Sequence, residues 1–300
     1  PHPWQGKGKH GQGGEGMMGG VPYGRAMAMA MMDDLRDGLQ LDSLSFTLGP
    51  FYRALPPGLQ LKLTLQGDLL QMAMIESSAY PVHLPALFFE ALQRPMPIAA
   101  LEIERARYHL YRLAQLMRIA GLGSLAQRTL ADAARIQPGS RLPDLYRRIT
   151  RSGLLQSFNP GLGQLDMHQA RMLGGVAWRA AGMPHDARSD DPSYARIGFE
   201  PLTHEGSDAR ARLLQTVAEI SQALSLATAA NELQLHTGNT ERVETPKGEL
   251  STEQRPADAS HLLMDLLPGL EWSQALLLIA GLDTAALSPY PMERQQAALC

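Results

Sequence analysis

Few residues of this chain have types and spacing that could do chemistry. Tyr52 and Arg53 follow Gly49 and Pro50 in a short loop. A phenol beside a guanidinium could orient a carbonyl group or tune a nearby metal cluster electrostatically. A lone Tyr-Arg pair is a weak motif, so we favour the alternative interpretation, in which the loop packs on a neighbouring subunit.

A second candidate is the segment AYPVHLP, which contains Tyr80 and His83. The unperturbed pKa of an imidazole lies near neutrality, so His83 could relay protons. Histidines inside proteins are usually held by hydrogen bonds, and that structural role is the interpretation we favour.

Several common catalytic and metal sites are excluded because their residues are missing. His109 and His204 have Glu104 and Glu205 nearby, but neither pair has the H-E-x-x-H spacing that puts two zinc ligands on one helix face. The sequence has no G-x-S-x-G nucleophile turn and no G-x-x-x-x-G-K-[ST] phosphate loop. Its single cysteine, Cys300, cannot form an intrachain disulfide or hold an iron-sulfur cluster. We expect this chain to bind no metal.

The composition restricts partners and location. A formal charge of -3, without basic runs, argues against nucleic acid as a partner. No apolar run approaches the ~18 to 20 residues that a membrane helix needs, so we expect no direct membrane span. The first residues lack the hydrophobic core of a secretory signal, which favours a cytoplasmic location.

The composition along the chain predicts one domain and a tail. Residues 1–35 are rich in glycine, histidine and methionine and are expected to form a flexible tail, whereas residues 36–300 form the domain. A polar stretch near residues 234–260 is expected to include an exposed loop.

The periodicity predicts the elements of the domain. Alternating apolar residues and turn signals between residues 39 and 73 predict antiparallel hairpins. Apolar residues three and four positions apart predict a helix that runs to about Arg135, broken or bent near Gly121 and Gly123, and a second long helix over residues 208–233. We therefore expect an α+β fold, with an N-terminal antiparallel β-sheet packed on a bundle of long helices.

Several blocks in order resemble one family, the large-subunit fold shared by nickel-iron hydrogenases and the 49-kilodalton component of complex I, its D subunit. The stretch LGPFYRALPPGLQLKLTLQGDLLQ resembles the family's opening Leu-Gly-Pro loop, strand and Gly-Asp turn, and EIERARYHLYRLAQLMRIAGLGSLA looks like its long central helix. RMLGGVAWRAAGMPHDARSDD and EGSDARARLLQTVAEI are similar to its Arg-Ala-Ser-Gly-Val block, Asp-x-Arg turn and Gly-Asp-initiated helix. TPKGEL and ALLLIAGLD resemble the last two landmarks.

The resemblance implies roles for three groups of residues. It puts the loop with Gly49, Pro50, Tyr52 and Arg53 at a quinone pocket or against a partner. Tyr80 and His83 fall on a segment similar to the family's Gly-Tyr-Leu-His, at the same pocket. Asp186 and Arg188 match an aspartate and an arginine that fix a turn in the family, and a buried ion pair there would mainly fix conformation.

Departures from the family pattern change the expected chemistry. Hydrogenases of this fold hold nickel and iron with two Cys-x-x-Cys pairs, which this sequence lacks, so no hydrogenase activity is expected. In the complex I members of the family, a histidine after Gly-Pro and a later tyrosine meet the two carbonyl oxygens of quinone. Residues 51–57 contain no histidine, and the chain is shorter than the family between Glu90 and Leu101. Ordinary quinone reduction is therefore not expected, although quinone binding stays open.

The resemblance implies a core subunit of a membrane-anchored oxidoreductase complex, either complex I-like (NADH-quinone oxidoreductase) or related to energy-converting hydrogenases, on the cytoplasmic face of the inner membrane. It would pack on an iron-sulfur small subunit that holds the cluster. Further partners would be a protein like the C subunit of complex I, and membrane-arm and antiporter-like subunits. Its role would be to couple electron transfer to ion translocation without a cofactor of its own. Two alternatives are a quinone-reducing subunit with a rearranged pocket and a free-standing helical binding protein.

Overall fold

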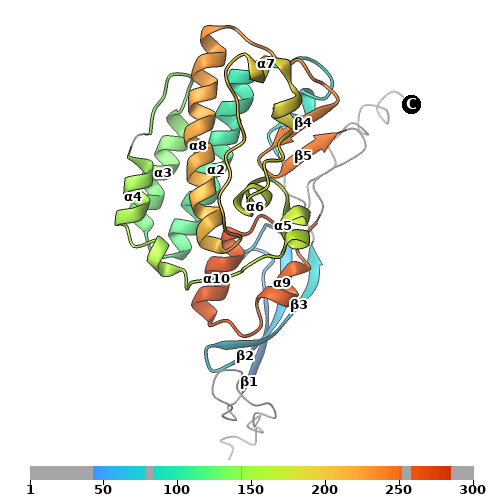
Figure 1. Ribbon diagram of the computed structural model, residues 1–300. Coiled ribbons are helices and arrows are strands. Elements are labelled where there is room, and N and C mark those ends of the chain that lie inside the picture. The colour runs from blue at the N-terminus through green and yellow to red at the C-terminus, as the bar shows by residue number, and fades with distance from the viewer. Residues whose placement is uncertain (1–42, 79–83, 143, 252–257, 285–300) are drawn as a thin grey trace, which may run out of the picture.

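The computed structural model describes residues 43–78, 84–142, 144–251 and 258–284, in which a small sheet adjoins a helical bundle (Figure 1). The expected α+β fold class is confirmed. The tail expected at residues 1–35 lies outside the described residues.

The sheet consists of β1 (Ser43–Leu48), β2 (Leu59–Gln66) and β3 (Leu69–Ser78), paired antiparallel in chain order. In the central strand, Leu61 and Leu63 are buried and Lys62 between them is exposed, because successive side chains of a strand point to opposite faces. Gly67 adopts a φ of 62° in the two-residue turn to β3, a conformation that glycine takes without steric cost.

Two long helices, α2 (Ile98–Ile119) and α8 (Ala209–Glu232), pack along each other at the centre of the bundle (Figure 1). Gly121, with a φ of 78°, ends α2, and α3 (Gly123–Arg135) returns to pack on it. Of the predicted break or bend, the structure has the break, because α2 and α3 are separate helices. The second predicted long helix is confirmed, and Asp208 begins it by accepting a hydrogen bond from the amide of Ala211 at 2.8 Å.

Shorter elements complete the bundle. The stretch between α4 (Leu145–Arg151) and α8 contains five helical elements of three to seven residues, which are too short to give a periodic signal. The remaining elements are α1 (Ala86–Glu90), α4 (Leu145–Arg151), η2 (Leu155–Ser157), α5 (Met167–Leu173), α6 (Gly175–Ala180), η3 (Ala187–Asp190), α7 (Pro192–Ala195), α9 (Leu262–Leu266) and α10 (Trp272–Gly281).

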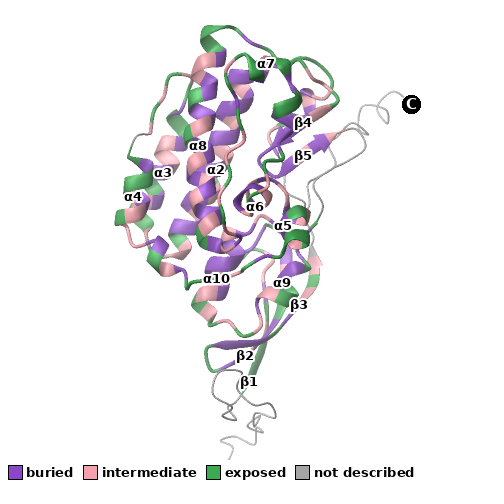
Figure 2. Ribbon diagram, in the orientation of Figure 1, coloured by how far each residue is buried: buried purple, intermediate pink, exposed green. Residues whose placement is uncertain are grey.

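One core cluster joins the sheet to the helices. It contains Leu61 and Leu63 of β2, Leu110 of α2, Val217 of α8 and Leu278 of α10, which are all buried. Buried residues accordingly follow the inner faces of α2 and α8 in Figure 2. In the described part of the chain, no helix is both long and apolar enough to cross a membrane.

The polar stretch near residues 234–260 differs from the expected exposed loop. Within it, β4 (Arg242–Thr245) and β5 (Gly248–Ser251) form a hairpin in which residues 243–248 are all buried. The hairpin turn packs directly on the backbone of Gly174 and Gly175, where any side chain would collide with it. Because the hairpin turn lies so close to these glycines, residues 243–248 are buried, although their polarity predicts that they are exposed. Residues 252–257 lie outside the described part.

Candidate functional site

A set of ionisable side chains lies buried where α2, α6, η3, α8 and β4 meet. We call it the buried charge network, and each member is at most 4% exposed. Its members are Glu102, Arg105, His109, Arg179, Asp186, Arg188, Glu219 and Glu244. Burying so many charges is costly unless they are paired, so their mutual geometry decides their charge states.

Arg179 of α6 is the centre of the network. Its Nε and Nη2 donate to the two oxygens of Glu219 at 2.8 and 2.9 Å. Its Nη1 donates to Oε1 of Glu244 at 2.7 Å and lies 3.1 Å from Oδ2 of Asp186. Burial alone would lower the pKa of Arg179, but the three carboxylates raise it above its ordinary value, so the guanidinium stays charged.

The second guanidinium, that of Arg188, ties Asp186 to α2. Its Nε and Nη2 donate to Asp186 at 2.9 and 2.7 Å, and its Nη1 donates to Glu102 at 3.0 Å. Burial raises the pKa of Asp186, but Arg188 and Arg179 outweigh it and hold that pKa well below the ordinary value. Asp186 also accepts the amide of Arg188 at 3.0 Å and so begins the short helix η3.

Glu102 and Arg105 extend the network along α2. Glu102 accepts hydrogen bonds from the Tyr194 hydroxyl at 2.7 Å and from Nε of Arg105 at 3.3 Å. Burial raises the pKa of Glu102, but Arg105 and Arg188 lower it below its ordinary value. Nη2 of Arg105 donates to the backbone carbonyl of Glu244 at 2.6 Å, which connects α2 to the hairpin.

His109 adjoins the network as a neutral group. Its Nε2 lies 3.6 Å from Oε2 of Glu219, beyond hydrogen-bond distance. Burial lowers the pKa of His109 to about 4, against the opposing effect of Glu219. Burial raises the pKa of Glu219, but Arg179 lowers it to about 2. At neutral pH the imidazole is therefore uncharged and Glu219 is ionised.

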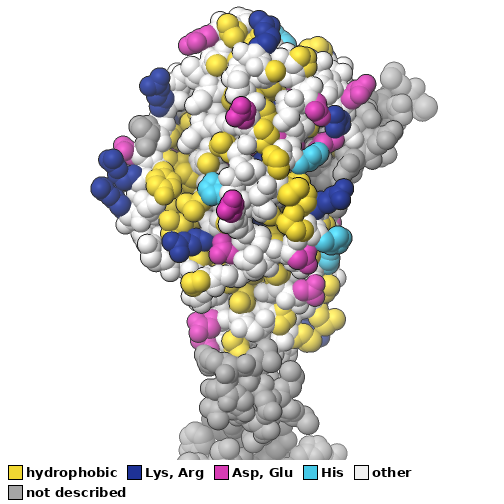
Figure 3. Space-filling model, in the orientation of Figure 1, with side chains coloured by type: hydrophobic (Ala, Val, Ile, Leu, Met, Phe, Trp, Pro, Cys, Tyr) yellow, Lys and Arg dark blue, Asp and Glu magenta, His cyan; other side chains and the backbone are white. Residues whose placement is uncertain are grey.

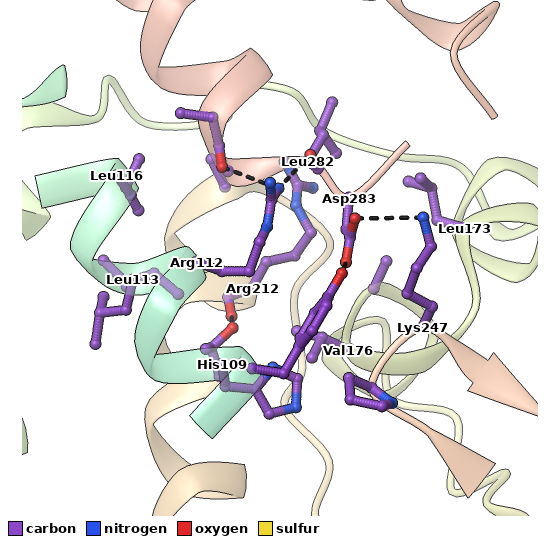
Figure 4. A pocket seen from close by; sticks show the side chains of 18 of the residues that line it. His109, Arg112, Leu113, Leu116, Leu173, Val176, Arg212, Lys247, Leu282 and Asp283 are labelled. Carbon is purple, nitrogen blue, oxygen red and sulfur yellow. Dashed lines mark hydrogen bonds and ion pairs between the residues drawn. The ribbon is translucent and has the colours of Figure 1, made fainter. Parts of the chain in front are cut away.

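A cavity of about 70 Å³ lies beside His109, enough for a few water molecules (Figure 4). Asp283 accepts a hydrogen bond from the Tyr108 hydroxyl and lies 3.3 Å from Nζ of Lys247. Arg112 donates to the carbonyls of Ala280 and Leu282 at 3.2 and 2.7 Å. Burial raises the pKa of Asp283, but Arg112 and Lys247 lower it below its ordinary value, so the carboxylate is charged.

Arg212 also lines this cavity, and its guanidinium is held by backbone carbonyls. Its Nη1 donates to the carbonyls of Gly163 and Ser207 at 2.9 and 2.5 Å. Burial lowers its pKa to about 10, with a smaller opposing effect from Asp208. Arg112, Arg212 and Lys247 therefore face one carboxylate, that of Asp283, which gives the wall of the cavity a positive balance.

The loop after Gly49 borders a different hollow, a surface groove of about 430 Å³. Pro50, Tyr52 and Arg53 line it from the loop, and Tyr111 lines it from α2. Gln115 of α2 donates from Nε2 to the carbonyl of Arg53, which holds the loop against the helix. We call this hollow the loop groove, and its aromatic side chains are half-exposed or exposed.

The predicted site residues are therefore in separate places. Tyr52 and Arg53 lie in the loop groove, whereas Asp186 and Arg188 lie in the buried charge network. Gly49 has a φ of 110°, and an added Cβ would lie 2.1 Å from the carbonyl oxygen of Leu59, so only glycine fits there. Tyr80 and His83, also assigned to a quinone pocket, lie outside the described residues, so their predicted roles stay predictions.

Sequence reasoning missed most of the network. Charged residues are usually exposed, yet Arg105 is 1% exposed. The available signal was its spacing from Glu102 and His109, at three and four residues on one face of α2. Arg179, Glu219 and Glu244 gave no such signal, because their partners are 40 to 65 residues away. Among the described residues, no group of three or more His, Cys, Asp or Glu is arranged to hold a metal ion.

Comparisons with known proteins show sequence similarity between this chain and one family. The family described as respiratory-chain NADH dehydrogenase, 49 Kd subunit, matches residues 118–263, a range that includes Arg179, Asp186, Glu219 and Glu244. The D subunit of NADH-quinone oxidoreductase from Thermosipho melanesiensis is 32% identical over 123 residues, which cover 37% of this chain and 33% of that protein. Its counterpart in Mycobacterium sp. (strain KMS) is 33% identical over 93 residues, 30% of this chain and 21% of that protein. These matches therefore span a third or less of the relatives' own length.

A solved structure has a similar fold. It is a chain from the membrane-bound sulfane sulfur reductase (MBS), an archaeal respiratory membrane complex, with a TM-score of 0.56 and 17% sequence identity. The similarity covers 81% of this chain and 96% of that chain. At this identity it supports the fold alone, whereas the sequence matches support the family. Over residues 118–263 the chain is therefore similar to the family of the 49-kilodalton subunit of complex I, also called its D subunit.

Proposed function

We propose that this chain takes the place of the 49-kilodalton subunit in a membrane-bound respiratory complex, attached to the cytoplasmic face of the inner membrane through its partners. It packs on an iron-sulfur small subunit that holds the redox cluster, beside a protein like the C subunit of complex I and membrane-arm and antiporter-like subunits. Its own task is to connect electron transfer in those partners to ion translocation, with no metal bound by this chain.

The family match carries this proposal. Both sequence relatives described above are named as parts of an NADH-quinone oxidoreductase, and the similar fold comes from a respiratory membrane complex. The matched range contains Arg179, Asp186, Arg188, Glu219 and Glu244, which are five of the eight members of the buried charge network.

The loop groove supports the presence of a partner. Phe51 beside it is 81% exposed and Tyr111 is 47% exposed, and both line the groove with Tyr52. Exposed aromatic side chains that gather at one concave place are typical of protein interaction sites. We assign the groove to contact with the iron-sulfur small subunit, as the resemblance implies for this loop.

The network gives a physical basis for coupling. Arg179 connects α6 to α8 through Glu219 and to the hairpin through Glu244. In a buried site of low dielectric, a change of one charge alters these interactions strongly. A charge change at the cluster in the partner would thus shift the balance of forces between the helices, which is the mechanical step that we propose.

The test is recovery of the intact complex. A tag on the full chain, extraction of native membranes with a gentle detergent and identification of the bound subunits are expected to recover an iron-sulfur protein and membrane subunits, with iron in the complex. Recovery of the chain alone from the soluble fraction would contradict the proposal and favour a free-standing binding protein.

A second candidate function is quinone reduction in a rearranged pocket. The loop groove has the volume typical of small-molecule sites, and Tyr52 and Arg53 line it with groups that can donate to a carbonyl. Arg53→Ala in the assembled complex is expected to leave quinone reduction unchanged if the groove is only an interface. A tenfold or greater fall in turnover, with the complex still assembled, would favour the pocket. His83→Ala tests the other predicted pocket residue in the same assay.

A further inference from the structure

We propose that Glu244 is a proton-binding site, a buried carboxyl group that is protonated at neutral pH and exchanges its proton with solvent through the pocket between α5, α6 and the β4–β5 hairpin. The inference deepens the proposed function and rests on it for the role in coupling, because it names the group whose charge would change. Its structural part stands on this chain alone.

The charge count of the network requires a proton. Three guanidinium groups, those of Arg105, Arg179 and Arg188, face four carboxyl groups, those of Glu102, Asp186, Glu219 and Glu244. With all seven ionised, the cluster would hold one uncompensated negative charge away from water. An unpaired buried charge is expensive, and proteins normally remove it by protonation.

The contacts of the four carboxyl groups differ, and they point to Glu244 as the one that is protonated. Glu219 receives two hydrogen bonds from Arg179, and Asp186 receives two side-chain bonds from Arg188. Glu102 has hydrogen bonds from Arg105, Arg188 and a tyrosine hydroxyl. Within the described part of the chain, the carboxyl group of Glu244 has one guanidinium contact and a longer bond of 3.2 Å from the amide of Ala187.

Glu244 also shares its one guanidinium nitrogen with another carboxylate. Nη1 of Arg179 lies 2.7 Å from Glu244 and 3.1 Å from Asp186, so the two carboxyl groups are within roughly 6 Å, where like charges disfavour ionisation. Burial, and then Asp186, raise the pKa of Glu244 above its ordinary value despite Arg179. Of the two carboxyl groups, Asp186 keeps the charge because Arg188 holds it.

The titratable and charged groups around Glu244 come from several elements. They are Glu102, Arg105 and His109 of α2; His168 and Arg171 of α5; Arg179 of α6; Asp186 and Arg188 of η3; Tyr194 of α7; Glu219 of α8; and Arg242, Lys247 and Glu249 of the hairpin itself. Lys247 is paired with Asp283, and Arg242 with Asp190 at 2.6 Å. Both hairpin cations are therefore engaged by other carboxylates.

An open pocket borders Glu244. Glu244 lines an open pocket of about 690 Å³, with His168 and His185 among the other residues that line it. Both histidines are exposed, and Nε2 of His185 lies 3.2 Å from Glu249. Figure 3 shows histidine, basic and hydrophobic side chains gathered over α5 and beside the hairpin. An imidazole ring can accept a proton at one nitrogen and donate one from the other, so histidines suit a rim that passes protons from water to a buried acid.

Protonation would change the forces on two helices. Loss of the proton returns one negative charge beside Arg179, which then shares its attraction between Glu244, Asp186 and Glu219. The contact of Arg179 with Glu219 joins α6 to α8, and the contact with Glu244 joins α6 to the hairpin. Binding and release of one proton thus alter the packing of α8 against its neighbours, which is the event that coupling to ion movement needs.

The experiment is infrared spectroscopy of the full chain at neutral pH. A protonated carboxyl group is expected to give one carbonyl-stretch band that shifts in heavy water and disappears at alkaline pH. Glu244→Gln is expected to abolish that band. Glu249→Gln, a matched change on the adjacent strand of the same hairpin, is expected to leave it in place.

Either absence of the band in the wild-type chain or its persistence in Glu244→Gln would overturn the proposal. Should Glu244→Gln fail to fold, nuclear magnetic resonance of the wild-type chain labelled at glutamate carboxyl carbons decides instead. One glutamate carboxyl carbon titrating well above the others is expected, and uniform titration near the ordinary value would contradict the site. Both measurements use the isolated chain, so a failed recovery of the respiratory complex would not affect them.

Discussion

Arg179 contacts three carboxyl groups with its guanidinium nitrogens. Arg179→Ala would leave Asp186, Glu219 and Glu244 buried without their shared cation, and removing one partner of a buried ion pair costs about 3 to 5 kcal/mol. We therefore expect a loss of that size in the free energy of unfolding, measured by urea denaturation. Arg242→Ala is the control, since its bridge to Asp190 is partly exposed and is worth at most about 1 kcal/mol. Equal losses in the two variants would contradict the central role of Arg179.

His109 predicts how stability depends on pH. Its pKa falls from 6.5 to about 4 in the folded chain, so the unfolded chain binds more protons between these values. The stabilisation from this group is present above pH 6.5 and is lost as pH falls towards about 4, by up to about 3 kcal/mol. His109→Gln cannot titrate, so its free energy of unfolding is expected to vary less over this window. His185→Gln, a change at an exposed histidine, should keep the wild-type slope, and a wild-type slope in His109→Gln would refute the interpretation.

At the scale of elements, alanine substitutions at two glycines with positive φ can distinguish the cost of an unfavourable backbone conformation from the cost of disturbed packing. Gly175, with a φ of 46°, would place an added Cβ 2.7 Å from the carbonyl oxygen of Pro246, whereas Gly121, with a φ of 78°, has open space around it. Gly121→Ala is expected to cost about 1 kcal/mol from conformation alone. Gly175→Ala should cost about 1 to 3 kcal/mol more, because the hairpin turn must move.

Hydrogen exchange can show which part of the chain is destabilised in Gly175→Ala. In Gly175→Ala, the amides of the β4–β5 hairpin are expected to exchange faster, while those of β2 keep their protection. If both glycine variants lost the same stability and the hairpin stayed protected, the close approach of α6 and the hairpin would not be a stabilising contact.

At the scale of the whole molecule, the loop groove predicts where a partner binds. Tyr111 and Tyr146 are both exposed tyrosines on helices, at 47% and 58%, but only Tyr111 lies in the groove. Tyr111→Ser is expected to lower recovery of the iron-sulfur protein at least tenfold in the pull-down, because interface aromatics carry much of the binding energy. Tyr146→Ser should recover it normally, and both variants should keep wild-type thermal stability. Normal recovery of the iron-sulfur protein with Tyr111→Ser would show that the loop groove is not the interface.

The fold class, the two long helices and a break or bend near Gly121 could be predicted from the sequence, and ordered motifs indicated the family resemblance, because periodicity and motifs are local properties of the chain. The sequence also singled out Asp186 and Arg188, since their spacing matches a family turn. It could not identify Glu244 or Arg179 as network members, and it expected exposure for a hairpin that is buried. Those features depend on the folded chain, because burial and charge pairing arise from residues that are far apart in sequence. The pKa of a carboxyl group depends on those neighbours, so the proposed proton site could be read only from the folded chain.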